Sequence, residues 1–259
     1  MINSVIPGRC FRVFKPRRNA RLRLFCFPHA GSGASAYLNW ARLFSEQIEV
    51  VAVQLPGREN RLSEPPFTRM TQVVRFLAAE IKEYLEQPFV FFGHSMGALI
   101  AFELSRYLNA KLNKQPLHLF VSGHTAPRLP KERLYDLPLT ELLARIQSFS
   151  GTPDEVMTSP ELLSILIPLL RADFSVCQTY AYTPHVPLSC PITAFAGNDD
   201  KPANSEVMRY WQEETTGEFC LYTFPGSHFF VLSSASEVVS ILEQQLQTSA
   251  QLSAASMAT

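Results

Sequence analysis

The chain has 259 residues, of which 46% are apolar and 18% are charged, and its 23 basic side chains equal its 23 acidic ones in number. A chain of this length buries roughly 70–75% of the surface that it exposes when unfolded, so a sizeable core and an enclosed site are possible. The zero net charge argues against a nucleic-acid-binding protein, because such proteins need a strongly basic surface.

The sequence also lacks the signs of a membrane or secreted protein. Its apolar runs are shorter than the ~18 residues that a spanning helix requires, and no secretory apolar segment precedes the first predicted strand. The five cysteines are scattered and odd in number, without a CxxC pair. This usage is typical of reduced thiols rather than of disulfides or a zinc site, so we expect a cytoplasmic protein.

Short apolar runs alternate with amphipathic segments along the chain. The apolar runs predict strands at residues 22–27, 49–54, 88–92, 117–121, 191–196 and 219–224. The amphipathic segments predict helices near residues 36–47, 69–85, 97–110, 203–215 and 234–246. Several runs are apolar on both faces, as expected of strands that helices cover on both sides. Because the two kinds of segment alternate, we predict an α/β protein with a mainly parallel sheet.

The stretch from residue 126 to residue 190 interrupts this alternation. It contains no convincing strand, many prolines, and helical periodicity near residues 138–149 and 159–182. We interpret residues 126–190 as a helical lid inserted over the C-terminal edge of the sheet, which leaves residues 1–125 and 191–247 as one core domain. The small and polar residues 248–259 predict a flexible tail.

A candidate nucleophile lies between a predicted strand and a predicted helix, in the pentapeptide GHSMG centred on Ser95. A G-x-S-x-G pattern in this context is the nucleophile elbow of α/β-hydrolases. The glycines are needed because side chains two residues either side of the serine would collide with the neighbouring strand and helix. We therefore predict an acyl hydrolase whose nucleophile is Ser95 and whose Met96 N–H faces the developing oxyanion.

The predicted general base is His228, which lies in a turn directly after the last predicted strand, at the same edge of the sheet as Ser95. Such a base needs an acid to fix its tautomer, and in this fold the chain order is serine, acid, histidine. The preceding strand ends in two adjacent carboxylates, Asp199 and Asp200. We predict Asp200 as the acid, with Asp199 as the alternative; both could instead cap the following helix.

The second oxyanion donor is expected in the loop after the first strand, FPHAGSG at residues 27–33. Its small residues let the backbone approach a bound acyl group, and Ala30 is the predicted donor. The loop lacks the glycine and lysine pattern of a phosphate loop. His29 has no partner at metal-ligand spacing, so we predict neither a metal nor a cofactor.

Five blocks of the chain together resemble the type II thioesterases that serve nonribosomal peptide and polyketide assembly lines. They are LFCFPHAG from residue 24, QLPGRENR from residue 54, FGHSMGA from residue 92, LRAD from residue 170 and PGSHF from residue 225. The likeness spans about residues 11 to 245, and it is specific because PGRE and LRAD are not general features of α/β-hydrolases. One departure is the order HAGSG, where the family usually reads HAGGS.

The resemblance implies the α/β-hydrolase fold, a triad of Ser95, Asp200 and His228, oxyanion N–H groups from Ala30 and Met96, and a lid at residues 126–190. It also implies a substrate: an acyl thioester on the phosphopantetheine arm of an acyl or peptidyl carrier protein, from which misprimed or stalled groups would be cleared. We further expect a monomer that meets carriers transiently and binds neither nucleic acid nor a membrane.

Several alternatives stay open at this point. An acyl-CoA thioesterase or a carboxylesterase would share every catalytic residue, whereas a catalytically silent scaffold would have a broken triad. Phe149 and Phe174 are either acyl-channel or core residues, and Asp173 is expected to be a buried hydrogen-bonding group. Arg58 and Arg61 are expected to anchor a loop through backbone contacts. Basic residues at the pocket mouth, interpreted as carrier contacts or more simply as solvated surface charges, are Arg17, Arg18, Arg128, Lys131 and Arg133.

Overall fold

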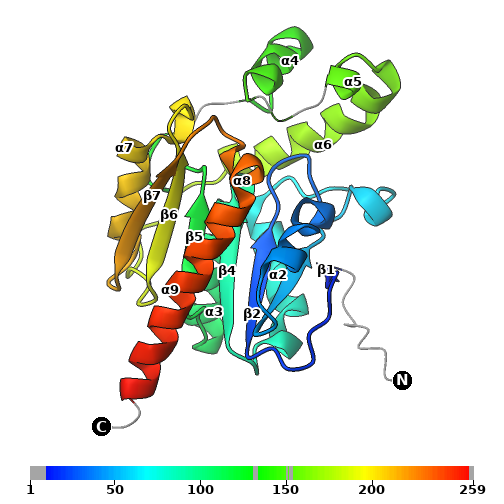
Figure 1. The fold of residues 1–259 in the computed structure, drawn as a ribbon. Coiled ribbons are helices and arrows are strands. Elements are labelled where there is room, and N and C mark those ends of the chain that lie inside the picture. The colour runs from blue at the N-terminus through cyan, green and yellow to red at the C-terminus, as the bar shows by residue number, and fades with distance from the viewer. Residues whose placement is uncertain (1–9, 131–133, 150, 152–153, 257–259) are drawn as a thin grey trace.

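The structure, a computed structural model, describes residues 10–130, 134–149, 151 and 154–256 (Figure 1). Within this part of the chain, seven strands form one sheet in the order β1-β3-β2-β4-β5-β6-β7. They are β1 (Phe11–Arg12), β2 (Leu22–Phe27), β3 (Ile48–Val53), β4 (Phe89–His94), β5 (Leu119–Ser122), β6 (Ile192–Gly197) and β7 (Phe219–Phe224). Strands β2 to β7 pair in parallel, and β1 pairs antiparallel with β3. The predicted α/β fold is confirmed.

The six predicted strands are confirmed to within two residues at each end, and β1 was not predicted. Two residues are too few to produce an alternating pattern in the sequence. The parallel register places the carboxyl ends of the strands at one edge, where Phe27 of β2 pairs with Gly93 of β4 and His94 pairs with Ser122 of β5. Residues that directly follow these strands are therefore close in space.

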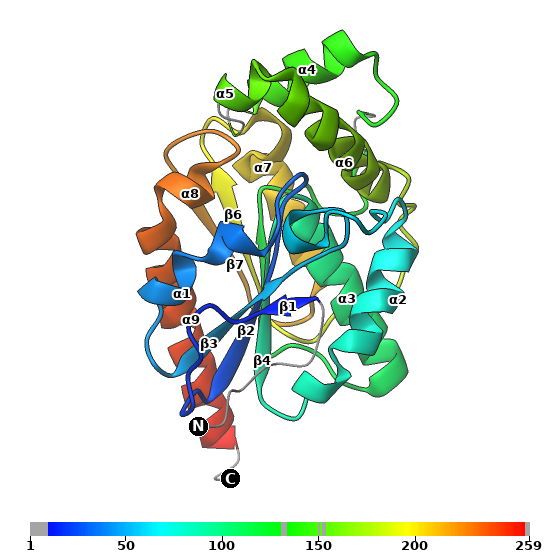
Figure 2. The same cartoon turned by 90° about the vertical axis from the view of Figure 1, so that its right-hand side faces the viewer.

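Helices cover both faces of the sheet (Figure 2). Helices α2 (Met70–Glu80) and α3 (Met96–Leu112) lie on one face, and α1 (Trp40–Leu43) and α9 (Ala235–Ser256) lie on the other. Alternate residues of each strand enter the two cores: in β4, for example, Phe91 packs with α2 and α3, whereas Phe92 packs with α1 and α9. This explains why the strands are apolar on both faces.

Two of the predicted helices are broken entirely into pieces of six residues or fewer. The segment predicted at 36–47 forms the 3-10 helix η1 (Ala34–Tyr37) and α1, and the segment predicted at 203–215 forms η4 (Lys201–Ala203), α7 (Ser205–Met208) and η5 (Arg209–Glu214). In the second segment the Asn204 side chain accepts hydrogen bonds from Glu206 N and Val207 N and so begins a new helix. Three further short helices are η2 (Glu59–Arg61), η3 (Lys82–Tyr84) and α8 (Phe230–Ser233).

Helix α9 continues to Ser256, into the stretch 248–259 for which we predicted a flexible tail, and the flexibility of that stretch stays a prediction. Alanine, glutamine and leucine in this stretch are good helix formers, which explains the extension. Residues 257–259 lie outside the described part of the chain.

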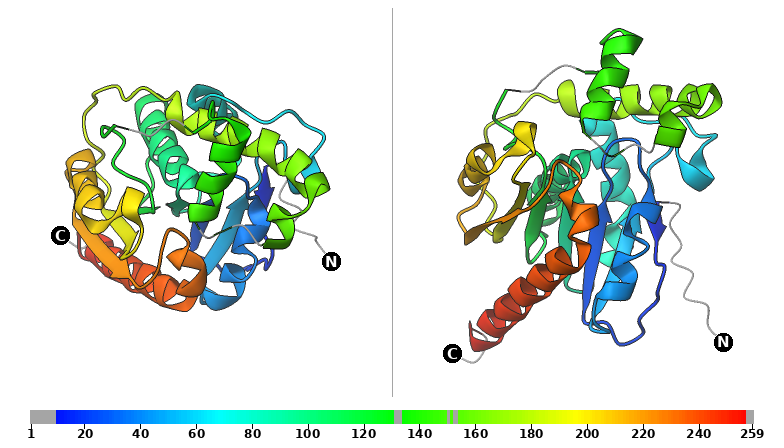
Figure 3. Two further views of the ribbon diagram at one scale, coloured as in Figure 1. Left: turned by 90° about the horizontal axis from the view of Figure 1, so that it is seen from above. Right: turned by 45° about the horizontal axis from the view of Figure 1, so that its top comes forward.

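Three helices follow one another between β5 and β6 and form what we call the helical block: α4 (Leu139–Ser148), α5 (Asp154–Met157) and α6 (Pro160–Gln178). The block lies above the carboxyl edge of the sheet (Figures 1 and 3). It occupies the stretch in which we predicted a lid, but the division of the chain into core and lid stays a prediction.

The two ends of α6 differ in burial. The helix begins at the Ser159 cap, whose hydroxyl accepts a hydrogen bond from Leu162 N, and Pro168 lies within it. Before Pro168 the side chains of Leu162 and Ile165 are 45% and 50% exposed. After Pro168 the buried side chains are Leu169, Leu170, Ala172, Asp173, Val176 and Cys177. The C-terminal half of α6 is therefore part of the packed molecule, and the N-terminal half extends over its surface.

Candidate active site

Ser95 lies in a strained turn between β4 and α3. Its φ of 54° and ψ of −120° fall outside the regions that residues with a side chain normally adopt, and its N–H donates to Ser122 O at 2.7 Å. A Cβ on Gly93 would lie 2.1 Å from Gly97 O, and a Cβ on Gly97 would lie 2.0 Å from Phe27 O. The predicted steric need for both glycines is confirmed. The turn presents Ser95 at the N-terminus of α3.

The structure joins Ser95, His228 and Asp200 by two hydrogen bonds. His228 Nε2 lies 3.0 Å from Ser95 Oγ, and His228 Nδ1 lies 2.8 Å from Asp200 Oδ2. Asp200 and His228 are only 2% and 8% exposed, whereas Asp199 is exposed. Of the two carboxylates, the geometry thus brings Asp200 to the histidine. The broken triad that a silent scaffold would require is absent from this site.

The two predicted oxyanion donors lie on neighbouring segments at the same edge. Met96 is the first residue of α3, directly after Ser95, and Ala30 lies in the loop that follows β2. Because Phe27 of β2 pairs with Gly93 of β4, this loop leaves the sheet beside the nucleophile turn.

The loop after β2 is held by a buried ion pair that links it to the helical block. Arg58 and Asp173 form two parallel hydrogen bonds, each 2.8 Å long, and both side chains are at most 3% exposed. Asp173 Oδ2 also accepts from Gly31 N at 2.8 Å, and Arg58 Nη1 donates to Ser32 O at 3.0 Å. The expectations of a buried hydrogen-bonding Asp173 and a loop-anchoring Arg58 are confirmed. Arg61 likewise donates to Gln54 O at 2.9 Å.

The pairing of Arg58 with Asp173 was missed by sequence reasoning, although both blocks that contain these residues, PGRE and LRAD, were singled out. The two residues are 115 positions apart, and neither carries a local pattern that names its partner. A bidentate arginine–carboxylate pair of this kind fixes both orientation and distance. It therefore ties the buried half of α6 to the loop that carries Ala30.

Two further histidines lie near His228 and are kept neutral by their surroundings. Burial lowers the pKa of His29 from 6.5 to about 4, with smaller contributions from His228 and Arg58. Burial also lowers the pKa of His94 well below 6.5, and its ring centroid lies 5.1 Å from that of His228. Neutral neighbours leave Asp200 as the charged group in direct contact with His228.

The helical block reaches His228 through Phe149, at the end of α4. The centroids of the two rings lie 5.1 Å apart. In the same segment a Cβ on Gly151 would lie 1.9 Å from the ring of Phe229, so Gly151 contacts this ring directly. Phe174, by contrast, packs against the small core within the block. Phe149 is thus placed at the site, and Phe174 is a packing residue.

A cavity of ≈ 520 Å³ opens beside this site, between the loop after β2 and α6. One wall is polar and includes His29, Ser32 and Arg58. The other wall is apolar and is formed mainly by the exposed half of the helical block: Val156, Leu162, Ile165, Leu166 and Leu169. An amphipathic molecule with a polar and an apolar side fits these walls.

The basic residues expected at the pocket mouth do not form one group. Arg17 is buried, so the interpretation of a solvated surface charge is wrong for it: its guanidinium donates to Ala41 O at 2.9 Å and to Phe44 O at 2.6 Å. Arg18 is exposed. Arg128 is paired with Glu213 and Glu214 rather than free in solvent. Lys131 and Arg133 lie outside the described residues.

The described residues also bear on a metal site and on a membrane-spanning helix. No cluster of three or more His, Cys, Asp or Glu side chains in this part of the chain could hold a metal ion. None of the helices described there combines the length and apolar character that crossing a membrane requires.

The chain is similar to known proteins over nearly its whole length. Residues 22–246 match the family of thioesterase domains. The gramicidin S biosynthesis protein GrsT of Aneurinibacillus migulanus is 46% identical over 230 residues, covering 88% of this chain and 90% of that protein. The solved type II thioesterase BorB from the borrelidin biosynthetic cluster has a TM-score of 0.84 at 33% identity, covering 92% of this chain and 97% of that one.

A second solved structure, ClbQ from the colibactin NRPS/PKS pathway, has a TM-score of 0.84 at 28% identity and covers 90% of this chain and 100% of its own. The family match and these neighbours agree with the mostly parallel sheet flanked by helices. The chain belongs to the thioesterase family and is a type II thioesterase of the α/β-hydrolase fold, an enzyme that hydrolyses thioesters.

Proposed function

We propose that this enzyme hydrolyses acyl thioesters carried on the phosphopantetheine arm of carrier proteins, through a triad of Ser95, His228 and Asp200 and an acyl-enzyme intermediate. The observation that carries the proposal is the pair of hydrogen bonds at 3.0 Å and 2.8 Å that joins the three side chains in the order required for acyl transfer. In the cell it would clear misprimed or stalled groups from a nonribosomal peptide or polyketide assembly line.

The reaction begins when Ser95 Oγ attacks the thioester carbonyl carbon and its proton passes to His228 Nε2. The carbon–sulfur bond then breaks, and the pantetheine thiolate leaves and takes up that proton. Water next attacks the acyl-serine carbonyl while His228 accepts one of its protons. The carboxylic acid is released as the proton returns to Ser95. Asp200 accepts the N–H of His228 Nδ1 and stabilises the imidazolium that forms in both steps.

The oxyanion of each tetrahedral intermediate would be stabilised by the N–H groups of Ala30 and Met96. Met96 N–H belongs to the first turn of α3, where helix N–H groups have no partner within the helix. The loop that carries Ala30 is fixed by the Arg58–Asp173 pair, so its N–H is held in place before the substrate arrives.

Two observations support a carrier-bound substrate. The cavity beside the site has one polar and one apolar wall, which suits a polar pantetheine arm joined to an apolar acyl group. The similar proteins include one named for gramicidin S biosynthesis and structures from the borrelidin cluster and the colibactin NRPS/PKS pathway. The remaining expectations belong to the same proposal: a monomeric cytoplasmic enzyme without a cofactor that meets acyl or peptidyl carriers transiently.

The test compares one acyl group on three leaving groups: a phosphopantetheinylated carrier protein, coenzyme A and p-nitrophenol. We expect the highest kcat/KM with the carrier protein, and loss of all three activities in Ser95→Ala. Ser63→Ala is the matched control because Ser63 is exposed and takes no part in the two hydrogen bonds that join the three side chains. Higher kcat/KM with coenzyme A or with the simple ester would identify an acyl-CoA thioesterase or a carboxylesterase instead.

A further inference from the structure

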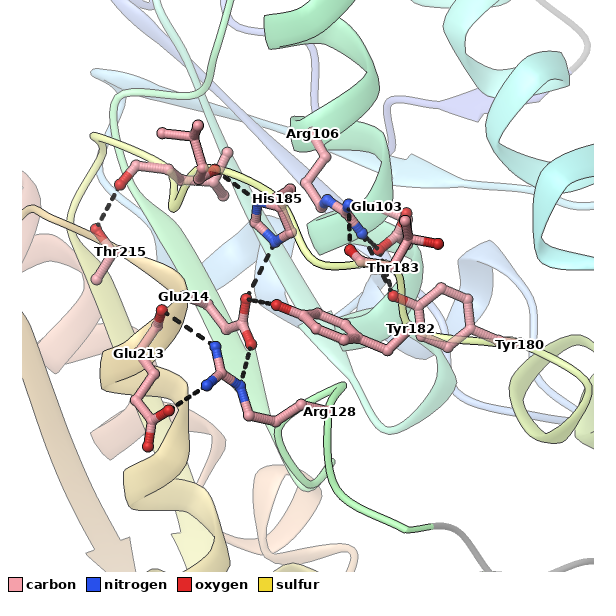
Figure 4. Close-up of polar contacts among 12 residues, drawn as sticks. Glu103, Arg106, Arg128, Tyr180, Tyr182, Thr183, His185, Glu213, Glu214 and Thr215 are labelled. Carbon is pink, nitrogen blue, oxygen red and sulfur yellow. Dashed lines mark hydrogen bonds and ion pairs between the residues drawn. The ribbon is translucent and has the colours of Figure 1, made fainter.

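Glu214, the last residue of η5, is a buried carboxylate on which two distant segments converge (Figure 4). One segment leaves β5 for the helical block and contains Arg128; we call it the outgoing leg, residues 123–130. The other returns from α6 to β6 and contains Tyr182 and His185; we call it the return leg, residues 179–191. The segments that lead into and out of the helical block therefore meet at one side chain.

The outgoing leg is held to η5 at two points. Arg128 Nε donates to Glu214 Oε1 at 3.0 Å, and its Nη1 is paired with Glu213. Trp211, also on η5, donates from its indole N–H to His124 O at 2.7 Å. Arg128 contacts the carboxylate with a charged donor, which is the stronger kind of hydrogen bond.

The return leg is held to the same residue through its side chains and its backbone. Tyr182 Oη donates to Glu214 Oε2 at 3.2 Å, and His185 Nε2 lies 3.1 Å from the same oxygen. Leu188 N donates to the Glu214 carbonyl at 2.9 Å. Burial and the Glu214 carboxylate both raise the pKa of Tyr182, so its hydroxyl stays protonated and able to donate.

Polar contacts matter for the return leg because apolar packing supports it on one side only. A cavity of ≈ 780 Å³ lies between this leg and helices α2 and α3, and it is lined by Tyr180, Thr183, His185 and Leu188 among others. Across it the leg is joined to α3 by hydrogen bonds from Arg106 to Thr183 O at 2.9 Å and from Tyr180 to Glu103 at 2.6 Å (Figure 4). A loosely packed segment of this kind depends on its hydrogen bonds for its position.

Removing only the charge of a buried carboxylate is destabilising when several charged and polar groups donate hydrogen bonds to it. If Glu214 loses its charge, Arg128 loses a charged acceptor and the two donors of the return leg lose their shared oxygen at the same time. The two legs would then keep the Arg128 guanidinium over the Tyr182 ring at 5.7 Å and their separate contacts with η5 through Trp211 and Leu188, but they would lose the shared carboxylate that ties them most tightly.

The position of the legs matters at the catalytic site. The helical block places Phe149 5.1 Å from the His228 ring and Gly151 against Phe229. We propose that Glu214 is a positioning residue: by holding both legs of the helical block together, it keeps Phe149 over His228 and controls how large acyl groups reach Ser95. This inference rests on the proposed triad, and it concerns access to Ser95 rather than the chemistry there.

The experiment compares Glu214→Gln with Glu213→Gln, a matched control, since Glu213 pairs with Arg128 alone and its side chain is 40% exposed. Kinetics are measured with p-nitrophenyl esters of two and of eight carbons, and hydrogen exchange is followed in peptides from both legs. In Glu214→Gln we expect KM for the eight-carbon ester to change by fivefold or more, kcat for the two-carbon ester to stay within twofold, and exchange to rise at least tenfold in both legs. In Glu213→Gln we expect all three to stay within twofold.

Two outcomes would overturn the inference: behaviour of Glu214→Gln like that of Glu213→Gln, or an equal loss of kcat with both esters. If Glu214→Gln does not fold, Tyr182→Phe removes one hydrogen bond from the return leg only. Exchange should then rise in the outgoing leg as well, and a rise confined to the return leg would contradict a link through Glu214. These ester assays need no carrier protein, so they remain informative even if the wild-type enzyme rejects carrier thioesters.

Discussion

The edge of the sheet and the helical block above it are built in contrasting ways. At the edge, Ser95, His228 and Asp200 follow three strands, lie within 3.0 Å of their partners and are mostly or fully buried. The block has a small core of its own and leaves Leu162 and Ile165 about half exposed. The comparison teaches that strand ends fix the candidate reacting atoms, whereas the element that we propose controls access to them is lightly packed.

The largest effect should come from changing the acid at the sheet edge. In Asp200→Asn we expect kcat to fall by about 10²–10⁴-fold, because the amide can no longer hold the His228 tautomer or stabilise its charged form. Asp199→Asn is the matched control: its side chain is exposed, and kcat should stay within twofold. Steady-state kinetics on one thioester measure both, and a larger loss in Asp199→Asn would reverse the assignment.

The Arg58–Asp173 ion pair, which joins the helical block to the loop after β2, should contribute more to the free energy of unfolding than to kcat. In Asp173→Ala the buried Arg58 is left without its partner, so we expect the free energy of unfolding to fall by about 3–5 kcal/mol. Neither side chain touches the reacting atoms, and the hydrogen bond from Arg58 to Ser32 O still holds the loop that carries Ala30, so kcat of the folded enzyme should change less than tenfold. Urea unfolding and kcat are measured on the same preparations.

The matched control for this contact is Glu161→Gln, on the same helix but exposed, for which the free energy of unfolding should stay close to that of the wild type. Two results would contradict the structural role of Asp173. One is an unfolding free energy that matches the wild type, and the other is a loss of kcat far larger than the loss of folded protein.

Much of the sheet edge could be predicted from the sequence because its signals are local. A serine between two glycines, after an apolar strand and before a helix, identifies the turn at Ser95. Strand ends then limit the partners to His228 and to Asp199 or Asp200. Apolar runs locate six strands for the same reason, whereas β1 has only two residues and leaves no pattern.

Contacts between distant segments could not be predicted in this way. Arg58 and Asp173 are 115 residues apart, and Arg128 and Glu214 are 86 residues apart. At such positions the partner residue determines whether a charged side chain can be buried, and the sequence of one segment does not reveal that partner. The same limit explains why Arg17 was interpreted as a surface charge, although three backbone carbonyls of other segments accept its hydrogen bonds.

A buried histidine at the amino end of β5, His118, should make the stability of the core sensitive to acid. Burial lowers the pKa of His118 from 6.5 to about 4, and its ring stacks on Phe120 with centroids 4.1 Å apart. The neutral form is favoured in the folded state, so its contribution is complete above pH 6.5 and is lost as the pH falls from 6.5 through 4. At pH 4 this loss amounts to about 2–3 kcal/mol.

His118→Gln removes this titration while keeping a polar group that can reach Thr193, which now lies 2.9 Å from His118 Nε2. Between pH 7 and pH 4 the variant should therefore lose about 2–3 kcal/mol less unfolding free energy than the wild type. Urea unfolding at several pH values measures the difference. His29 and His94 titrate in the same direction in both proteins, so equal pH slopes would contradict the assignment to His118.

The smallest expected effect is that of Phe149→Ala, which distinguishes a role of the helical block in substrate access from a role in the chemical step. Phe149 contacts His228 from the helical block and is itself only partly buried, so Phe149→Ala removes apolar contact at the site without opening the main core. We expect KM for a long-chain thioester to rise about threefold to tenfold, which corresponds to about 0.7–1.4 kcal/mol of lost binding. For a two-carbon ester, kcat should stay within twofold. Phe174→Ala, at a partly buried residue that packs against the core of the block, is the comparison variant: it should lower the unfolding temperature more than Phe149→Ala does. Equal loss of kcat with both substrates in Phe149→Ala would mean that the block takes part in the chemistry, and the contrast between the two regions would then fail.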